Sequence, residues 1–384
     1  METSQLNQSQ EPRILDFSND LILQSKKIPL LNPSEFETKV WAFVREFLEE
    51  NPYIELKTSG STGEPKTILA EKEKLKISAQ RTLDFLDLNP KNQKSTHPDL
   101  FFALVLPIEY IAGKMMVIRA LVAGAKLLVI EPKTQICFPI GCPKIALLAL
   151  TPMQLSQSLE GFPEVSHVLL GGAKLNENLQ EQIHTTFEKK RENNKNLPTF
   201  WETFGMTETF SHIALKQVFL KKNAFFEVFD SVEIFQDESG CLGLKDKALG
   251  LHLKTEDLVE VLSAKTFVWK GRKGNVINSA GVKIFPESIE NILEAKLGFP
   301  FFVHGIPDDV MGQKVSLFLE VGENLSDLEK ENIKTKTLQT LENLKDSLGK
   351  FQKPKAIFLL KTFERTLSGK IQRDKTVKEF LELM

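Results

Sequence analysis

The stretch LKTSGSTGEPKTI, Leu56 to Ile68, places a polar loop directly after an apolar segment typical of a β-strand. Small or hydroxylated residues run without interruption from Thr58 to Gly63, and Lys66 follows shortly after. Glycines let backbone N–H groups approach phosphate oxygens, and Ser or Thr hydroxyls add further donors. The stretch therefore indicates either a phosphate-binding loop or a flexible turn, because Ser, Thr and Gly clusters are also ordinary loop chemistry.

The loop departs from the common P-loop pattern, in which Gly, four residues and then Gly-Lys-Ser/Thr follow one another. Gly60 is followed five residues later by Pro65, which lacks a backbone N–H group. The proline also biases Glu64 away from helical geometry, and this disfavours a helix directly after the loop. A mobile phosphate loop of another type and a mere turn both remain open on these residues alone.

Composition excludes several kinds of partner. The 384 residues allow a large core, and usual domain sizes predict two or three domains. Lys and Arg number 49 and Asp and Glu 51, so no overall basic field attracts nucleic acid or anionic lipid. The polar amino terminus has no apolar core of the signal-peptide type, and the apolar runs are too short to span a bilayer. We expect a cytoplasmic protein without nucleic-acid or membrane partners.

Cysteines and histidines give no sign of a disulfide framework or of a protein-held transition metal. Cys137 and Cys142 lack the second pair that a zinc site needs, and Cys241 is isolated. The six histidines are scattered, without a His-Glu-x-x-His cluster. We expect the three cysteines to be reduced structural thiols.

From about residue 100, short apolar runs alternate with longer amphipathic ones. The runs are LFFALVLP, AGKMMVIRALVAG, AKLLVIEP, KIALLALTP and VSHVLLGG. The alternation predicts an α/β fold with mostly parallel sheets flanked by helices. Near Gly271 the pattern changes to strand-like pieces broken by Gly, Lys and Asn. We therefore expect a large N-terminal domain over residues 1–270 and a small α+β C-terminal domain over residues 271–384.

Two further stretches predict surface helices. FETKVWAFVREFLEEN has the spacing of an amphipathic helix that closes the core. Leu338, Leu341, Leu344 and Leu348 repeat at helical spacing among charged residues, which predicts a helix packing one face on its own sheet.

Further motifs follow the opening loop in a fixed order. They are LPIEYIAGKMM, LLGGAKL, WETFGMTET, LKTEDLVEV, KGRKGNVINSAGVKIFPESIE and ERTLSGKIQR. With TSGSTGEPK they resemble the adenylate-forming superfamily, which includes acyl-CoA synthetases, firefly luciferases and the adenylation domains of peptide synthetases. The resemblance covers most of the chain from about residue 56 to residue 373. It implies an adenylation domain, a mobile C-terminal domain on a hinge, and the use of ATP, Mg²⁺ and coenzyme A.

The resemblance also implies site residues. Phe204 would lie against adenine, Thr207 would contact the α-phosphate and Glu208 would hold Mg²⁺. One or two carboxylates are enough to bind Mg²⁺ when ATP phosphates supply other ligands. Asp257 would bind the ribose hydroxyls. Lys370 would bridge the substrate carboxylate and the α-phosphate, offsetting negative charge as the phosphate reacts. The other implied ATP or AMP contacts are Thr58, Ser59, Gly60, Ser61, Thr62, Gly63, Lys66, Gly171, Gly172, Ala173, Gly205 and Arg272.

The resemblance extends to the moving parts, with some departures. Arg272, Lys273 and Gly274 match the hinge, and Ser279, Ala280 and Gly281 match the turn beside the coenzyme A tunnel. Glu256, Gly274, Ala280 and Glu364 stand where the family usually has Gly, Asp, Gly and Pro. Glycine can absorb large backbone changes, so Gly274 is compatible with a hinge although the usual side-chain contact is lost.

One stretch narrows the substrate. Tyr110 stands where many relatives have His, and compact members with Tyr-Ile-Ala-Gly-Lys-Met-Met here resemble ligases that act on o-succinylbenzoate in menaquinone biosynthesis. Because only 57 residues precede the loop, we expect a minimal version of the large domain. A dicarboxylate substrate would need a cation for its spectator carboxylate. Lys114 is the first hypothesis for that cation and Arg119 the reserve.

Other functions remain open, because a fold alone does not decide among the jobs of a superfamily. The chain would otherwise be a synthetase for another aryl or acyl carboxylate, or a domain that loads a separate carrier protein. A catalytically inactive nucleotide-binding relative is a further alternative, and a homodimer is left open.

Overall fold

The computed structural model describes most of the chain. The described residues are 13–25, 27–57, 67–89, 100–191, 197–221, 223–294, 296–323, 325–349, 351–365 and 371–382. The loop residues Thr58 to Lys66 and the predicted catalytic Lys370 lie outside these ranges. Among the described residues, none of the helices combines the length and the hydrophobicity needed to cross a membrane.

A large mixed sheet forms the centre of the first 272 residues. Its twelve strands follow the order β1-β5-β4-β6-β7-β8-β9-β10-β14-β13-β12-β11. The bounds are β1 Ile14–Asp16, β4 Phe101–Leu104, β5 Lys126–Val129, β6 Ile145–Leu150, β7 Val165–Leu170, β8 Thr199–Met206, β9 Ser211–Gln217, β10 Phe226–Val228, β11 Val232–Gln236, β12 Cys241–Asp246, β13 Leu251–Ser263 and β14 Thr266–Arg272. The predicted α/β class is confirmed.

The sheet has a parallel half and an antiparallel half. Strands β5, β4, β6, β7 and β8 pair in parallel, and from β8 onward through β9 to β11 every pairing is antiparallel. The expected alternation of strands and helices from residue 100 therefore holds as far as β8. The antiparallel half was not expected, because its strands carry weaker period-two patterns than the apolar runs.

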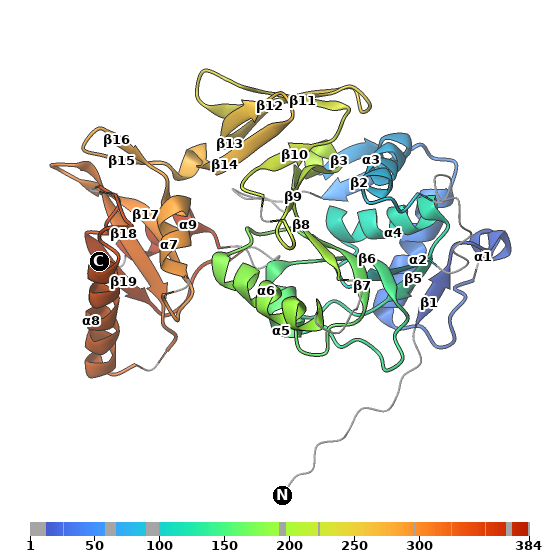
Figure 1. Cartoon of the computed structure of the whole chain (residues 1–384), viewed down its shortest axis with the longest axis horizontal. Helices are drawn as coiled ribbons and strands as arrows, with labels where there is room; N and C mark the ends of the chain where they lie inside the picture. The colour runs from blue at the N-terminus through green and yellow to red at the C-terminus, as the bar shows by residue number, and fades with distance from the viewer. Residues whose placement is uncertain are drawn as a thin grey trace, which may run out of the picture.

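Helices cover both faces of the parallel half (Figure 1). Their bounds are α2 Glu35–Leu48, α3 Lys72–Phe85, α4 Ile111–Ala123, α5 Pro152–Ser158 and α6 Glu177–Arg191. One core joins the sheet to α2, α3 and α4 through residues such as Val44, Leu75 and Met115. A second core on the other face joins it to α5 and α6 through Leu155 and Ile183. This layering is the usual arrangement for a sheet whose parallel strands are buried on both sides.

The predicted amphipathic helix is confirmed as α2. Ser34 begins it with a capping box, in which its Oγ accepts from Glu37 N at 3.2 Å and its own N donates to Glu37 Oε2 at 2.7 Å. At the other end of α2, buried Lys72 donates to the carbonyls of Glu46 and Glu49 at 2.7 and 2.9 Å. A cation at a helix carboxyl end is favoured by the helix dipole, so Lys72 fixes α3 against α2.

A separate two-stranded hairpin flanks the opening loop. Strand β2 (Tyr53–Lys57) pairs antiparallel with β3 (Thr67–Glu71), and Lys57 lies opposite Thr67. The strand predicted before the loop is confirmed, and a strand rather than a helix follows it. The two ends of the loop segment are thus held side by side.

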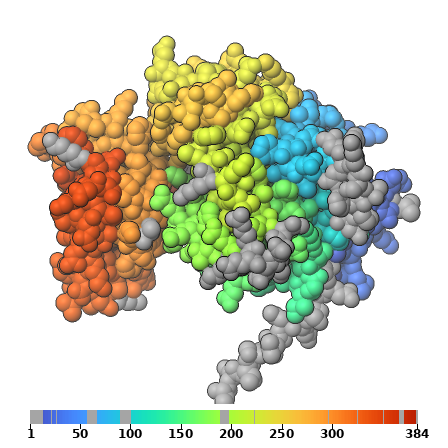
Figure 2. Space-filling model, viewed as in Figure 1, coloured from blue at the N-terminus to red at the C-terminus, as the bar shows by residue number. Residues whose placement is uncertain are grey.

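A second sheet with its own helices follows β14. It is built from β15 (Ile277–Ser279), β16 (Val282–Ile284), β17 (Phe301–Asp308), β18 (Gly312–Glu320) and β19 (Ala356–Leu360). Helices α7 (Pro286–Glu294) and α8 (Asp327–Asn343) share one apolar core with it, and α9 (Arg373–Glu382) lies in another. Figure 2 shows this part, in orange and red, standing beside the rest of the molecule. The chain leaves the large sheet at Arg272, and the domain boundary near residue 270 stays a prediction.

The predicted leucine-rich helix is α8, with a shorter extent than its leucines suggest. It ends at Asn343, so Leu344 and Leu348 follow it in the next turns. Leu341 and Leu348 are buried in the core of the second sheet, whereas Leu338 is 56% exposed. The helix therefore packs one face on its own sheet, but through fewer of the four leucines than expected.

Candidate active site

The carboxyl ends of parallel strands meet at one edge of a sheet, where α/β proteins commonly bind ligands. Gly171 to Ala173 directly follow β7, and Thr207 and Glu208 directly follow β8. Tyr110 stands at the amino-terminal cap of α4, the helix that follows β4. The structure thus brings three of the predicted motifs to the same edge of the large sheet.

Close backbone approach explains the glycines at this edge. Thr203 Oγ1 donates to the carbonyl of Leu170 at 3.1 Å, and a Cβ on Gly171 would lie 2.6 Å from that same Oγ1. Gly172 has φ +83°, a left-handed conformation that favours glycine. A Cβ on Gly205 would lie 2.4 Å from His212 Cα, where the strand bulges between Phe204 and Gly205. A larger residue at Gly171 would push against Thr203, and one at Gly205 would push β8 away from β9.

A single turn of 3₁₀ helix, η1 (Thr207–Thr209), carries two predicted ligands of the nucleotide. Thr207 is half-buried and Glu208 is exposed. Met206 N donates to Thr209 Oγ1 at 3.1 Å, and Thr209 Oγ1 lies 2.7 Å from Ser211 O, its acceptor on the far side of the turn. The turn ends at Phe210, whose φ of +60° is unusual for a residue with a side chain. Glu208 is therefore held on a tightly closed, outward-facing turn.

Glu208 fits a magnesium ion that is held mainly by substrate phosphates. The described residues contain no group of three or more His, Cys, Asp or Glu side chains able to hold a metal. Mg²⁺ in phosphate-transfer sites commonly uses one or two carboxylates together with waters and phosphate oxygens. One exposed carboxylate on this turn satisfies that requirement.

Phe204 belongs to a cluster of aromatic side chains. Its ring centroid lies 5.6 Å from that of Phe226 and 5.0 Å from that of Phe267. Lys216 Nζ lies 4.9 Å from the Phe226 ring centroid and 2.5 Å from Glu202 Oε2. Phe204 itself remains half-buried, so part of its ring stays accessible beside Phe226 and Phe267.

The antiparallel half brings Asp257 and Arg272 together. They are direct partners in the β13–β14 register, and Arg272 Nε lies 3.5 Å from Asp257 Oδ1. Trp269 Nε1 donates to the same oxygen at 3.0 Å. Asp257 is only 6% exposed, and its Oδ1 is held by both of these neighbours.

The two predicted substrate cations lie on different sides of α4. Lys114 is half-buried, with Nζ 4.4 Å from the ring centroid of Phe43 in α2. Arg119 is 3% exposed and donates from Nη2 to Ser211 Oγ at 2.8 Å. Because Arg119 is buried, it offers no open surface to a ligand, and direct contact with a substrate carboxylate is not supported.

The predicted hinge and tunnel residues lie beyond β14. Lys273 and Gly274 form η2 (Lys273–Asn275) and are exposed, whereas Ser279 is buried at the end of β15. Ala280 and Gly281 form the following turn with φ +50° and +78°. The turn therefore imposes on Ala280 a backbone conformation that glycine adopts more easily.

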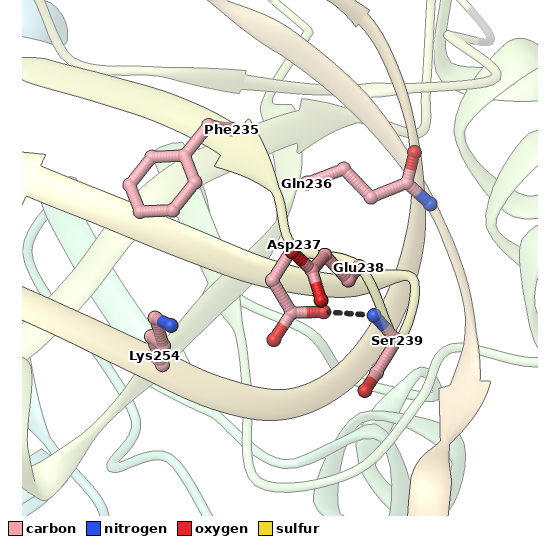
Figure 3. A pocket seen from close by; sticks show the side chains of 6 residues that line it. All are labelled: Phe235, Gln236, Asp237, Glu238, Ser239 and Lys254. Carbon is pink, nitrogen blue, oxygen red and sulfur yellow. Dashed lines mark hydrogen bonds between the residues drawn. The ribbon is translucent and has the colours of Figure 1, made fainter.

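One described pocket lies at the β11–β12 turn (Figure 3), where the hinge candidate Lys273 donates from Nζ to Ser239 Oγ at 3.2 Å. It is lined by Phe235, Gln236, Asp237, Glu238, Ser239 and Lys254. Asp237 Oδ1 accepts from the backbone of Ser239 and of Cys241 at 2.9 Å each, which closes the turn. The carboxylate is thus occupied in shaping the hairpin.

The family comparison matches this arrangement. Residues 10–226 match the family model described as AMP-binding enzyme, which is more than half of the chain. The chain belongs to the AMP-binding enzyme family. The matched region contains the loop segment, the Gly171 turn and η1, and ends shortly before the β13–β14 pair.

Several relatives of this AMP-binding enzyme have names that mention a substrate. A 2-succinylbenzoate–CoA ligase of Staphylococcus epidermidis is 26% identical over 308 residues, covering 72% of this chain and 61% of the relative. A 2-succinylbenzoate–CoA ligase of Listeria monocytogenes is 25% identical over 346 residues, covering 83% of this chain and 68% of the relative. The chain thus spans about three fifths of the length of the first of these proteins.

Solved structures agree on the fold. An acyl-CoA synthetase (AMP-forming)/AMP-acid ligase II-like protein from Dyadobacter fermentans is 28% identical, with a TM-score of 0.56 and coverage of 96% of this chain and 99% of that one. An o-succinylbenzoate CoA synthetase from Bacillus subtilis, solved with its acyl-adenylate intermediate, is 21% identical, with a TM-score of 0.67 and coverage of 84% and 68%. At that identity the second likeness concerns the fold alone.

Sequence reasoning missed some residues at this site of the AMP-binding enzyme. Lys174 directly follows Ala173, and its Nζ donates to Asn291 Oδ1 of α7 at 2.7 Å while lying 5.5 Å from the Trp269 ring centroid. Ser211, three residues after Glu208, accepts the hydrogen bond from Arg119. Their nearness to recognised motifs was the available signal, but their partners are distant in sequence.

Proposed function

We propose that this chain is an ATP-dependent carboxylate–CoA ligase that forms an acyl-AMP intermediate. The observation that carries the proposal is the closed η1 turn, which presents Glu208 beside Thr207 at the carboxyl edge of the parallel strands. A carboxylate for Mg²⁺ next to a hydroxyl for phosphate suits phosphoryl chemistry, in which positioning and electrostatic stabilisation dominate. Family membership and the Asp257–Arg272 pair support the same assignment.

The first half-reaction would be adenylation. The substrate carboxylate attacks the α-phosphorus of MgATP, the bond to the β-phosphate oxygen breaks, and acyl-AMP and pyrophosphate result. Thr207 would donate to the α-phosphate, and Glu208 would hold Mg²⁺, which neutralises phosphate charge. Lys370 and the loop residues Thr58 to Lys66, outside the described residues, would add positive charge and N–H donors.

The second half-reaction would be thioester formation. The thiolate of coenzyme A attacks the acyl carbon, and AMP leaves. In our proposal the C-terminal domain rotates about Arg272 to Gly274, which withdraws Lys370 and brings the Ser279–Gly281 turn to the site. A hinge at element ends can absorb such backbone changes. One site would thus serve both steps.

For the substrate we propose o-succinylbenzoate. The names of the relatives support it, and so does the YIAGKMM stretch at the start of α4. Lys114 remains the proposed partner of the spectator carboxylate, and Tyr110 the adjoining residue of the pocket. Exchange of Lys114 for Met should raise the KM for the acid about tenfold, since an interaction with a charged group is lost. An unchanged KM would remove Lys114 from this role.

The deciding experiment measures pyrophosphate and AMP release by the purified full chain with MgATP and coenzyme A. o-Succinylbenzoate is compared with benzoates and fatty acids, for wild type, Lys370→Ala and Lys378→Ala. We expect turnover confined to o-succinylbenzoate and slowed roughly 10²–10³-fold by Lys370→Ala. Lys378, 77% exposed on α9, is the matched control and should leave the rate unchanged. Turnover with another acid would keep the mechanism and change the substrate, whereas ATP binding without AMP formation would indicate an inactive relative.

A further inference from the structure

A buried cation lies directly behind the η1 turn. Arg119, in α4, donates from Nη2 to Ser211 Oγ at 2.8 Å, and its Nη1 lies 3.7 Å from Met116 Sδ. Ser211 begins β9 and is the register partner of Met206, the last residue of β8. The guanidinium therefore ties the helix that follows β4 to the turn that follows β8.

The charges around Arg119 do not form an ion pair with it. Arg81 is paired with buried Asp246 at 2.5 Å, and its Nη2 donates to the carbonyl of His212 at 2.9 Å. Among the described residues no carboxylate lies within ion-pair distance of Arg119, and its buried Nε has no hydrogen-bond partner there. Burial and the nearby Arg81 lower the pKa of Arg119 to about 9, so it stays charged at neutral pH.

A guanidinium buried without a counter-ion is costly, so packing alone explains it poorly. In place of a carboxylate, the guanidinium faces the hydroxyl of Ser211 and the imidazole of His212. Arg119 Nη2 also lies 3.5 Å from His212 Nδ1, and this histidine fixes the direction of the network. The Nη2 group of Arg119 thus donates to the first two residues of β9.

The tautomer of His212 follows from the nitrogen that faces Arg119. A guanidinium can only donate, so Nδ1 facing Arg119 is the unprotonated nitrogen, and Nε2–H then donates to Thr82 Oγ1 at 3.1 Å, which itself donates to Ser78 O. His212 is neutral, because burial and the two arginines hold its pKa well below the usual value. Arg119 can donate to Nδ1 and to Ser211 Oγ from the same Nη2 group, because that group carries two N–H bonds.

The contact extends from Ser211 to the turn itself. The carbonyl of Ser211 accepts from Thr209 Oγ1 at 2.7 Å, and Thr209 Oγ1 accepts from Met206 N at 3.1 Å. These bonds close the turn that holds Thr207 and Glu208. A displacement of Ser211 would consequently move both predicted nucleotide ligands.

We propose that Arg119 is a positioning residue for adenylation, which holds Ser211 and, through it, the Thr207–Thr209 turn in register for MgATP. The inference rests on the proposed function of that turn. This role differs from that of a substrate cation, because Arg119 is buried and contacts Ser211 rather than a ligand. It links the helix that carries the acid-binding candidates to the turn that carries the nucleotide candidates.

The test compares Arg119→Met, Ser211→Ala and the double variant with wild type in pyrophosphate release. We expect each single variant to raise the Mg²⁺ concentration for half-maximal rate and to lower the adenylation kcat about tenfold, with the KM for coenzyme A unchanged. The double variant should be no worse than the worse single variant, because both changes break one connection. Ser211→Ala keeps the test available if Arg119→Met does not fold.

Lys265→Met is the matched control for lost stability. Lys265 Nζ donates to the carbonyls of Asp230 and Val232 at 2.6 and 2.8 Å and lies 3.5 Å from that of Phe229, so its bonds involve neither Arg119, Ser211 nor the η1 turn. It should lower the melting temperature without changing the Mg²⁺ requirement. Wild-type kinetics in a destabilised Arg119→Met protein would overturn the inference and leave Arg119 a structural residue.

A failure of the proposed function can be distinguished from a failure of the Arg119 inference. If the wild type releases no pyrophosphate, calorimetric titration with MgATP replaces turnover, and Arg119→Met should then weaken binding about tenfold. If wild type binds MgATP and the variant binds equally well, the inference is wrong while nucleotide binding stands. If wild type binds no nucleotide, both proposals are wrong.

Discussion

The parallel and antiparallel halves of the large sheet present their candidate residues in different ways. In the parallel half the strands are buried apolar runs, and the candidates lie on turns after the strand ends, as with Gly171 after β7 and Thr207 after β8. In the antiparallel half the candidates lie within strands, as with Asp257 opposite Arg272. The choice of residue in the turns is limited by the volume available to a side chain. The choice of residue within the paired strands is limited by the partner on the neighbouring strand. The two halves should therefore fail under different substitutions.

The largest effect should come from added volume at the junction of the halves. Gly205→Ala would place a Cβ 2.3 Å from Ser211 O, a backbone atom that cannot turn aside. We expect a loss of about 3 kcal/mol in the free energy of unfolding, measured by urea denaturation. Gly298→Ala is the control, since a Cβ there would meet nothing within 4 Å. Equal stability of the two variants would show that the turn tolerates volume.

Removal of a charge partner should affect the antiparallel half through binding. Asp257→Ala removes the acceptor of Trp269 Nε1 and the proposed ribose contact. We expect MgATP affinity to fall by about 2 kcal/mol, roughly thirtyfold, in calorimetric titration. Glu260→Gln, on the same strand, breaks only the exposed pair with Lys270 and should leave affinity unchanged. Comparable losses in both variants would mean that the strand responds to charge in general.

A smaller effect should appear in the pH dependence of stability. Burial and two arginines depress the pKa of His212, so the native state holds it neutral while the unfolded state takes up a proton below about pH 6.5. Stability should therefore fall as the pH drops from about 6.5 to about 5. His212→Gln should reduce that slope by about 1.4 kcal/mol per pH unit in urea denaturation at several pH values. Identical slopes would indicate that His212 has the same pKa in the native and unfolded states, which would contradict the depressed pKa.

The sequence predicted the elements whose signals are local. The apolar runs after residue 100 identified β4 to β7 and α4, and the motifs singled out Gly171 and Thr207, which lie directly after β7 and β8. The Asp257–Arg272 contact depends on antiparallel register, which a motif does not specify. The Arg119–Ser211 bond joins residues 92 positions apart, and no period within α4 distinguishes a side chain that meets β9 from one that meets α2. Lys114 and Arg119 were for that reason considered for the same role, although they lie against different elements.

Strand β14 also constrains the order in which the protein can be assembled on the ribosome. Strands β11, β12 and β13 form a meander of sequence neighbours, and they join the rest of the sheet only through β14, which lies between β13 and β10. A nascent chain that has emerged only as far as Ser263 thus holds two sheet fragments with open edges, which are prone to pair wrongly. Emergence of Thr266–Arg272 joins them in one step. The candidate residues on the turns after β7 and β8 can therefore take their places during synthesis before the Asp257–Arg272 pair has formed.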